Sequence, residues 1–235
     1  MNENQMSDSF ILNAFLAFSG GFQDAYTFIT RDRVFANAQT GNIVQTSMYL
    51  MEGEWRMGLR YLFPVLAYAF GICAAELIHK KMRESNNIHW RQMVLGFEIA
   101  ILVIVAFLPE KLNMLANLLV SFSCAMQVQG FRKIHGFAYA STMCIGNLRS
   151  GMDALTNYFL DRDPKRLKAA RFYFGIIFVF GLGGGIGAIV SKEAGFAAIL
   201  VSVVILLLCY VMMQHWNEYN VNLEYVDPMH EFLDN

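Results

Sequence analysis

The chain has 235 residues, of which 56% are hydrophobic and only 16% are charged. Soluble domains carry about a quarter charged residues, so this chain has too little charge to cover a surface that faces water on all sides. The hydrophobic content also argues against a disordered chain, and the net charge of −1 gives no overall attraction for nucleic acid. The composition therefore predicts that much of the surface faces lipid.

Six segments approach the roughly 20 apolar residues that are needed to cross a hydrocarbon core. In chain order they are residues 10–29, 61–78, 93–108, 112–131, 172–191 and 194–213. The last segment carries no charge, whereas the first and the fourth contain polar residues. A soluble protein rarely contains even one such run. The six runs therefore predict an all-α, polytopic membrane protein.

Two further stretches, residues 34–51 and 137–160, have a polar first half that contains glycine and a second half typical of a helix. Lipid-exposed spans with this composition would be unfavourable. Irregular backbone at membrane depth persists only where protein surrounds it or where it lines a cavity. We therefore expect two re-entrant or broken helices that line a protected cavity.

The whole chain, residues 1–235, is predicted to form a single membrane domain that ends in a polar C-terminal tail at residues 214–235. The N-terminus lacks Lys and Arg, which argues against a cleavable signal peptide. All four cysteines lie in apolar segments without metal-ligand spacing, so we expect neither a disulfide framework nor a metal site. Because no catalytic or nucleotide-binding motif is present, we expect no enzyme and no cofactor.

The two halves of the chain, residues 10–108 and 112–213, resemble each other at a shift of about 104 residues. The matches are mostly polar residues inside apolar runs, which makes chance agreement less plausible. They pair Asn13, Phe18, Ser19 and Gln23 with Asn117, Phe122, Ser123 and Gln127, and, after a one-residue insertion, Gly41-Asn42 with Gly146-Asn147. This pattern predicts an internal repeat.

The distribution of Lys and Arg distinguishes two topologies, because cytoplasmic loops carry an excess of both residues. Eight full crossings would divide them eight against nine, whereas six crossings and two re-entrant segments divide them eleven against six. The six-crossing topology, with both termini on the basic cytoplasmic side, is therefore favoured. Three crossings per half would invert the second half, as in many secondary transporters. Eight spans with parallel halves are the alternative.

Asp24 lies inside the first apolar segment. A carboxylate at the centre of a membrane helix costs about 2.5–3.5 kcal/mol on insertion scales, so such groups usually face a cavity or a partner. Asp24 is therefore a candidate proton- or cation-linked group, or a group that orients the broken helix. The alternative is an acid near the membrane surface that pairs with Arg31 or Arg33.

The stretches Asn37–Asn42 and Ser141–Asn147 put Gly41 and Gly146, each followed by an asparagine, where a half-helix would begin. Unpaired N–H groups at a helix start form a positive dipole end that can bind an anionic or polar ligand. Asn42 and Asn147 are therefore candidates to cap these helices or to bind a ligand directly. The alternative is that the glycines only permit close helix crossings.

Other polar residues inside apolar segments are expected to point inward. Gln23 and Gln127 would form interhelical hydrogen bonds or contact a solute. Arg149 and Asp153 are four residues apart and are expected to pair on one helix face, with solute binding as the alternative. Glu76 and Glu98 are expected near helix ends, where they reach the surface or a basic partner.

The run of glycines between residues 181 and 187 lacks the spacing of a nucleotide-binding loop. The spacings of four between Gly181 and Gly185 and between Gly183 and Gly187 instead predict smooth helix faces for close contact. Such a face would suit an internal contact or a second copy of the chain.

The motif Gly21-Phe22-Gln23-Asp24-Ala25, followed by Thr40-Gly41-Asn42, resembles the YoaK-like family of bacterial inner-membrane proteins. The resemblance covers nearly the whole chain and implies a small multi-pass protein of the bacterial inner (plasma) membrane. It marks Gly21, Asp24, Thr40, Gly41 and Asn42 as the positions to carry over. The second half departs from the pattern, because Ile145 replaces the threonine. The family brings no established substrate.

Together these features predict a secondary transporter or permease for a small polar or anionic solute. The alternative is a non-transporting membrane sensor or assembly partner. The expected partners are the lipid bilayer and a small-molecule solute, with a second copy of the chain as a further candidate and without nucleic acid. The predicted site residues are Asp24, Gln23, Asn37, Thr40, Gly41, Asn42, Gln127, Gly146, Asn147, Arg149 and Asp153.

Overall fold

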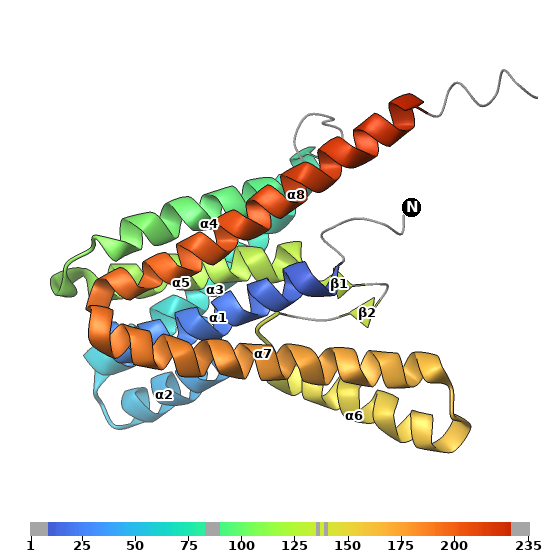
Figure 1. Cartoon of the computed structure of the whole chain (residues 1–235). Helices are drawn as coiled ribbons and strands as arrows, with labels where there is room; N and C mark the ends of the chain where they lie inside the picture. The colour runs from blue at the N-terminus through green and yellow to red at the C-terminus, as the bar shows by residue number, and fades with distance from the viewer. Residues whose placement is uncertain (1–8, 83–89, 135–136, 139–140, 227–235) are drawn as a thin grey trace, which may run out of the picture.

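The computed structural model describes residues 9–82, 90–134, 137–138 and 141–226 (Figure 1). Apart from an antiparallel pair of two-residue strands, β1 (Lys133–Ile134) and β2 (Phe137–Ala138), these residues form helices and their connections. The α-helices are α1 (Phe10–Thr30), α2 (Gln39–Met51), α3 (Trp55–Met82), α4 (Trp90–Ala106), α5 (Asn113–Gly130), α6 (Cys144–Asp161), α7 (Pro164–Ala194) and α8 (Leu200–Val226). The predicted all-α class is confirmed, and every predicted segment contains a helix.

Several helices extend beyond their predicted bounds. α7 begins at Pro164 because the Asp163 side chain accepts a hydrogen bond from the Lys165 backbone N–H at 2.9 Å, and proline is favoured in a first helical turn. α8 continues to Val226, so the first part of the predicted C-terminal tail is helical. α2 starts at Gln39 and α6 at Cys144, so the first residues of the predicted segments 34–51 and 137–160 are not helical.

Two helical runs among the described residues are long and apolar enough to cross a membrane, Trp55–Met82 and Pro164–His215. The second run contains both α7 and α8, which turn back on each other at the short 3₁₀ helix η3 (Gly195–Ile199) (Figure 1). The predicted count of six is not reached by this criterion. α4 has only 17 residues, and the polar residues of α1 and α5 lower the mean hydropathy of those helices.

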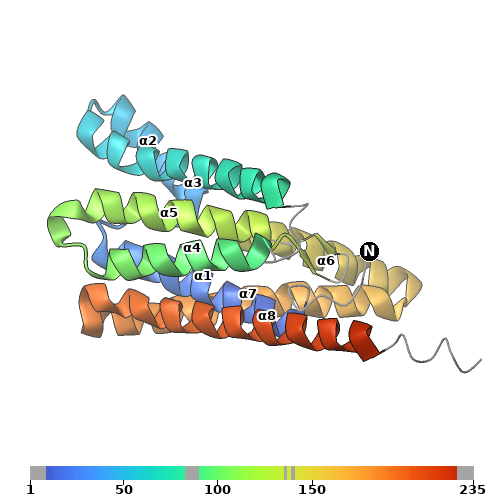
Figure 2. The same ribbon diagram turned by 90° about the horizontal axis from the view of Figure 1, so that it is seen from above.

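The helices lie roughly side by side, and their connections gather at two ends of the bundle (Figures 1 and 2). One end contains the C-terminus of α1 and the turns α2–α3, α4–α5 and α7–α8, of which α4–α5 includes the 3₁₀ turn η2 (Glu110–Leu112). The opposite end contains the C-termini of α3 and α5 and the turn between α6 and α7. That second end carries Lys80, Lys81, Arg91, Arg132 and the basic run 162–171. This end therefore carries more Lys and Arg than the other.

Close helix pairs hold the bundle together at glycines. Gly183 lies so near the Phe18 carbonyl of α1 that a Cβ would have no room, and Gly187 makes a less close approach to the backbone of Phe22. Gly71 of α3 makes the corresponding approach to the Phe122 carbonyl of α5. The predicted close-contact face of Gly183 and Gly187 is confirmed.

The close-contact face predicted for Gly181 and Gly185 is not formed within the chain, because a Cβ at either position would have nothing within 4 Å. They belong to the opposite face of α7, together with the exposed side chains of Phe178 and Ile189. Large exposed apolar side chains of this kind occur on all eight helices, including Phe15, Met51, Phe70, Ile104, Leu115, Ile145, Phe178 and Val204. The outer surface of the bundle is therefore apolar over much of its area, as the composition predicts.

The chain returns to the middle of the bundle before α2 and again before α6. The Asn37 side chain donates a hydrogen bond from Nδ2 to the Gly20 carbonyl at 3.2 Å. Gly20 is ten residues before the end of α1 at Thr30, which is about 15 Å along the helix axis. The Thr142 methyl group also packs against Gly20, where a Cβ would overlap it. α2 and α6 thus begin near the middle of α1 and run to opposite ends of the bundle (Figure 1).

Candidate functional site

Asp24 is held by the backbone that precedes α2. Its carboxylate accepts a hydrogen bond from the Asn37 N–H at 2.7 Å, and the backbone N–H groups of Ala36 and Ala38 also interact with it. Cys144, the first residue of α6, lies near the same carboxylate. Asp24 is buried, with 7% of its surface exposed. The Asp24 carboxylate therefore faces backbone N–H groups of the segment before α2 and lies near the start of α6.

Asp24 does not pair with Arg31 or Arg33, the alternative considered from sequence. Arg31 is fully buried and turns toward the C-terminal end of α4, where its guanidinium donates to the carbonyls of Val105 and Leu108 at 2.9 and 3.0 Å. It also donates to Asn113 Oδ1 at 2.9 Å and lies over the Phe196 ring. A cation at a helix C-terminus is stabilised by the helix dipole, so Arg31 joins α1, α4 and α5. In the sequence Arg31 resembled a loop residue, because Asp32 and Arg33 follow it.

Asn42 fixes the turn between α1 and α2. Its side chain donates to the Phe35 carbonyl at 2.7 Å and accepts from the Phe35 N–H at 3.3 Å. It also donates to Gln39 Oε1 at 2.9 Å. Thr40 is exposed, and Gly41 lies inside the first turn of α2, where a Cβ would make only ordinary contact with Phe35. The TGN motif thus contributes mainly through Asn42, which closes the turn.

The corresponding positions at the start of α6 differ. Asn147 is buried, with 3% of its surface exposed, whereas Gly146 is exposed and has no neighbour within 4 Å of a Cβ. Both glycines lie two residues after the first residue of their helix, so neither one ends a helix.

Glu98 lies at the centre of a second buried group. It is the ninth of the 17 residues of α4 and is fully buried. Gln23 donates from Nε2 to Glu98 Oε1 at 3.0 Å. With its amide nitrogen toward Glu98, Gln127 donates to both carboxylate oxygens at 3.0 and 3.1 Å. The expectation that Glu98 lies near a helix end is wrong, because α4 begins at Trp90 and ends at Ala106.

The two glutamine amides connect Glu98 to the segments that precede α2 and α6. Cys124 donates from Sγ to Gln23 Oε1 at 2.9 Å, and Cys124 lies next to Asn37. The Gln127 amide oxygen accepts from Ser141 Oγ at 3.2 Å. We call this set, Cys124–Gln23–Glu98–Gln127–Ser141, the Glu98 chain. The inward orientation predicted for Gln23 and Gln127 is confirmed.

Between Asp24 and the Glu98 chain lie buried polar atoms that have no hydrogen-bond partner among the described residues. They are Asn37 Oδ1, Tyr68 Oη and Thr142 Oγ1, and each side chain is at most 8% exposed. Tyr68 lies beside both Thr142 and Cys124. We call Asn37, Tyr68, Cys124 and Thr142 the central cluster. Tyr68 Oη faces the Thr142 hydroxyl, and other described side chains such as Ser121, Ser191 and Ser202 also lack a partner. Because buried polar atoms normally have partners, the atoms of the central cluster are candidates to contact a polar ligand.

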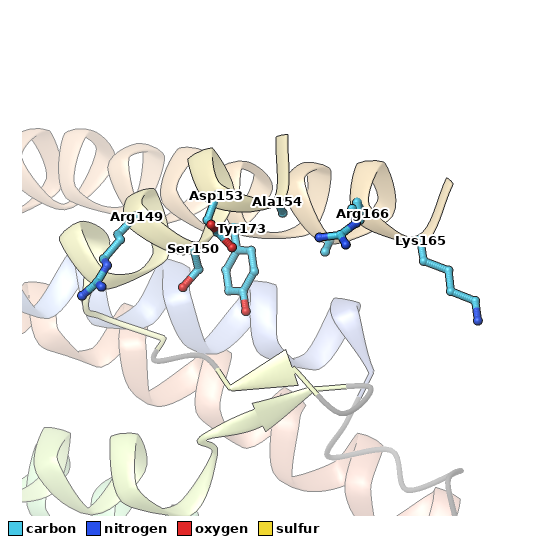
Figure 3. A pocket seen from close by; sticks show the side chains of 8 residues that line it. Arg149, Ser150, Asp153, Ala154, Lys165, Arg166 and Tyr173 are labelled. Carbon is cyan, nitrogen blue, oxygen red and sulfur yellow. The ribbon is translucent and has the colours of Figure 1, made fainter. Parts of the chain in front are cut away.

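Arg149 and Asp153 lie away from the central cluster. They line a cavity of about 610 Å³ between α6 and α7, together with Ser150, Lys165, Arg166 and Tyr173 (Figure 3). Both are exposed, and the structure, which describes both residues, shows no ion pair between them. In Figure 3 the Arg149 side chain extends away from Asp153. The ion pair expected from their spacing is therefore not formed.

Among the described residues, no three or more His, Cys, Asp or Glu side chains gather as metal ligands would. The sequence did not single out Tyr68 or Cys124 for the site, because a tyrosine and a cysteine in apolar segments are usually packing residues. The predicted site residues thus divide into four places: the segment between Asp24 and Asn42, the Glu98 chain, the first turn of α6 with Gly146 and Asn147, and the α6–α7 cavity.

A family model for a protein of unknown function (DUF1275) matches residues 12–212, a range that contains both returning segments and both buried carboxylates. The chain belongs to this family. The family's description assigns no activity, and the YoaK-like name stays a prediction. No curated protein and no solved structure matches the chain.

Proposed function

We propose that this DUF1275 protein is a small secondary transporter of the bacterial inner membrane that carries a small polar solute. The observation that carries the proposal is the meeting of the two returning segments at Gly20, next to buried polar atoms without partners. Half-helices that begin at the midplane are the usual way in which secondary transporters bring polar backbone to a solute.

Depth within the bundle supports two re-entrant segments and six crossings. Asn37 returns about 15 Å along α1, which is half of a hydrocarbon core of roughly 30 Å. α2 then runs back to the end of the bundle at which α1 ends. α6 likewise runs back to the opposite end, at which α5 ends. In this topology Lys80, Lys81, Arg132 and the basic run 162–171 share the cytoplasmic side with both termini.

Packing supports two related halves of opposite orientation. The predicted shift of about 104 residues relates Phe18 to Phe122, and these two carbonyls face Gly183 and Gly71 respectively. The repeat relates α1 to α5 and α3 to α7. The α1–α7 pair therefore corresponds to the α5–α3 pair, and both pairs are in close contact. A solute site near Gly20 would then lie where the two halves meet, as in other transporters built from inverted repeats.

The charges favour a neutral or cationic solute over an anionic one. Asp24 already accepts hydrogen bonds from the backbone before α2 and lies near the first residue of α6. The positive end of α2, which would attract an anion, is therefore occupied by a carboxylate of the protein itself. The central cluster offers hydroxyl, thiol and amide groups, which suit a small neutral hydrogen-bonding molecule or an amine.

A ligand-dependent unfolding screen followed by uptake tests this proposal. Purified protein in lipid nanodiscs is heated with panels of neutral polar solutes, amines and small anions. A transported solute should raise the melting temperature in a saturable way, because it binds the folded state. The same solute should then accumulate in proteoliposomes.

Matched pairs of variants make the uptake experiment specific to the central cluster. Tyr68→Phe and Thr142→Val each remove one unpartnered hydroxyl and should lower the affinity for the solute by up to about tenfold. Tyr210→Phe in α8 and the exposed Thr156→Val in α6 remove the same groups elsewhere and should leave uptake unchanged. Equal effects of both pairs, or stabilisation by anions alone, would contradict the proposed site.

The second candidate function is that of a non-transporting assembly partner. It is favoured by the fact that Asp24, Gln23, Asn42 and Gln127 all have hydrogen-bond partners within the chain. On this account the polar residues only join helices. It predicts that no solute stabilises the purified protein and that the Tyr68→Phe variant behaves like the wild type.

A further inference from the structure

Glu98 is a buried carboxyl group without a basic partner. α1 contributes Gln23 to its surroundings, α5 contributes Gln127 and Cys124, and α8 contributes Cys209. Among the described residues, no Lys, Arg or His contacts its carboxylate. A buried charge that is balanced only by neutral amides is costly, so the surroundings also tolerate a neutral carboxyl group.

We infer that Glu98 is a proton-binding site whose protonation reverses the hydrogen bonds that join it to Gln127 and Ser141 in the Glu98 chain. Binding forms one O–H bond at a carboxylate oxygen with a proton that comes from bulk water, and release returns that proton to water. A role of Glu98 in coupling protons to transport rests on the proposed function. Its role as a proton-binding group is independent of that function.

The direction of the hydrogen bonds favours a proton over a metal ion. With Glu98 ionised, the groups that face it are the amide N–H donors of Gln23 and Gln127, at 3.0 to 3.1 Å. A bound metal cation would need amide oxygens to face it instead. The oxygens of both amides are already occupied by the donors Cys124 and Ser141.

The Gln127 amide has partners in both of its orientations. With nitrogen toward Glu98, it donates to the carboxylate and accepts from Ser141. With nitrogen toward Ser141, it donates to Ser141 Oγ at 3.2 Å and to the Leu16 carbonyl at 3.4 Å, and its oxygen faces Glu98. The first orientation suits a carboxylate and the second suits a protonated carboxyl group, which donates.

The outer hydroxyl can reverse as well, because a hydroxyl both donates and accepts. A protonated carboxyl group has a single O–H and donates one hydrogen bond, so one amide turns. Gln127 turns its oxygen to Glu98, Ser141 becomes an acceptor, and Gln23 still donates to the other carboxyl oxygen. Ser141 lies three residues before the first residue of α6, so the charge of Glu98 is transmitted to the start of that helix.

Infrared difference spectroscopy tests this inference without any transported solute. Wild-type protein in lipid is titrated with acid, and the C=O stretching band of protonated carboxylic acids is recorded. A band that is present in the wild type should be lost in Glu98→Gln and retained in Glu76→Gln. The control is matched, because Glu76 of α3 also accepts from an amide, Gln129 Nε2, at 2.9 Å.

Gln127→Met provides a second readout if Glu98→Gln fails to fold. It removes one hydrogen-bond partner of Glu98, so the same band should persist and move to higher frequency. A band that is unchanged in Glu98→Gln, lost in Glu76→Gln, or unmoved in Gln127→Met would overturn the inference. None of these results depends on transport. If the band behaves as expected but no solute is taken up, proton binding stands and the proposed function fails.

Discussion

The two buried carboxylates of this protein, Asp24 and Glu98, are stabilised by different kinds of donor. Asp24 is held by backbone N–H groups in the turn before α2, and these donors cannot rotate. Glu98 is held by the side-chain amides of Gln23 and Gln127, and these donors can rotate. The donors around Asp24 are therefore suited to fix one conformation of the turn, whereas those around Glu98 are suited to change between two states. Fixed donors build the turn, and rotatable donors allow a switch.

Replacement of Asp24 should give the largest loss of stability. Asp24→Leu leaves the Asn37 N–H and its neighbours without an acceptor in the protein interior, where each unsatisfied group costs about 1–3 kcal/mol. Unfolding in detergent should show a loss of about 3 kcal/mol or more. Asp24→Asn keeps one acceptor and should lose about half as much. Equal stability of Asp24→Leu and the wild type would contradict the role of the turn.

Replacement of Glu98 should cost less, because its donors can turn to other acceptors. In Glu98→Met the Gln127 amide still reaches Ser141 and the Leu16 carbonyl, so we expect a loss of about 1 kcal/mol in the same unfolding assay. Glu98→Gln should be nearly as stable as the wild type. A loss larger than that of Asp24→Leu would remove the distinction between fixed and rotatable donors.

A double-mutant cycle measures whether the two carboxylates belong to separate networks. Glu98→Gln and Gln127→Met should be coupled by at least about 0.5 kcal/mol, because the two side chains are in contact. Asp24→Asn and Gln127→Met should be additive within about 0.3–0.5 kcal/mol. Equal coupling in the two cycles would indicate one network rather than two.

Tyr68→Phe should have the smallest effect on stability. Its hydroxyl has no partner among the described residues, so removal should change the unfolding free energy by less than about 0.5 kcal/mol. Solute affinity, in contrast, should fall. A large loss of stability together with unchanged affinity would mean that the hydroxyl has a structural partner.

The helical segments were predictable from the sequence because apolar length and polar interruption are local properties. The first halves of segments 34–51 and 137–160 were predicted to be irregular, and α2 and α6 do begin inside those halves, although Gly41 and Gly146 lie within the first helical turns. The spacing of the glycines in α7 predicted two contact faces, and only the face of Gly183 and Gly187 is in contact. Spacing shows which residues share a helix face, but the partner of that face, here α1, comes from a distant part of the chain.

The partners of the buried charges could not be predicted, because they come from distant segments. Asp24 bonds to a turn 13 residues away, and Arg31 bonds to the end of α4 and the start of α5, 74 to 82 residues away. The central position of Glu98 depended on the true bounds of α4, which extend to Trp90. The expected pair of Arg149 and Asp153 fails because the two exposed side chains extend in different directions along the α6–α7 cavity (Figure 3).

Side-specific labelling of three positions tests the central claim, two re-entrant half-helices of opposite orientation. Arg33→Cys lies before α2, Glu54→Cys lies in the turn after α2 and Lys165→Cys lies at the start of α7, and all three positions are exposed. Membrane-impermeant thiol reagents are applied to intact cells and to inverted vesicles, with the parent protein as the control for its native cysteines. The account predicts that Arg33→Cys and Glu54→Cys are labelled only from outside and Lys165→Cys only from inside. Labelling of Arg33→Cys and Glu54→Cys from opposite sides would mean that α2 crosses, and labelling of Glu54→Cys and Lys165→Cys from the same side would mean that α6 crosses. Either result would contradict the account.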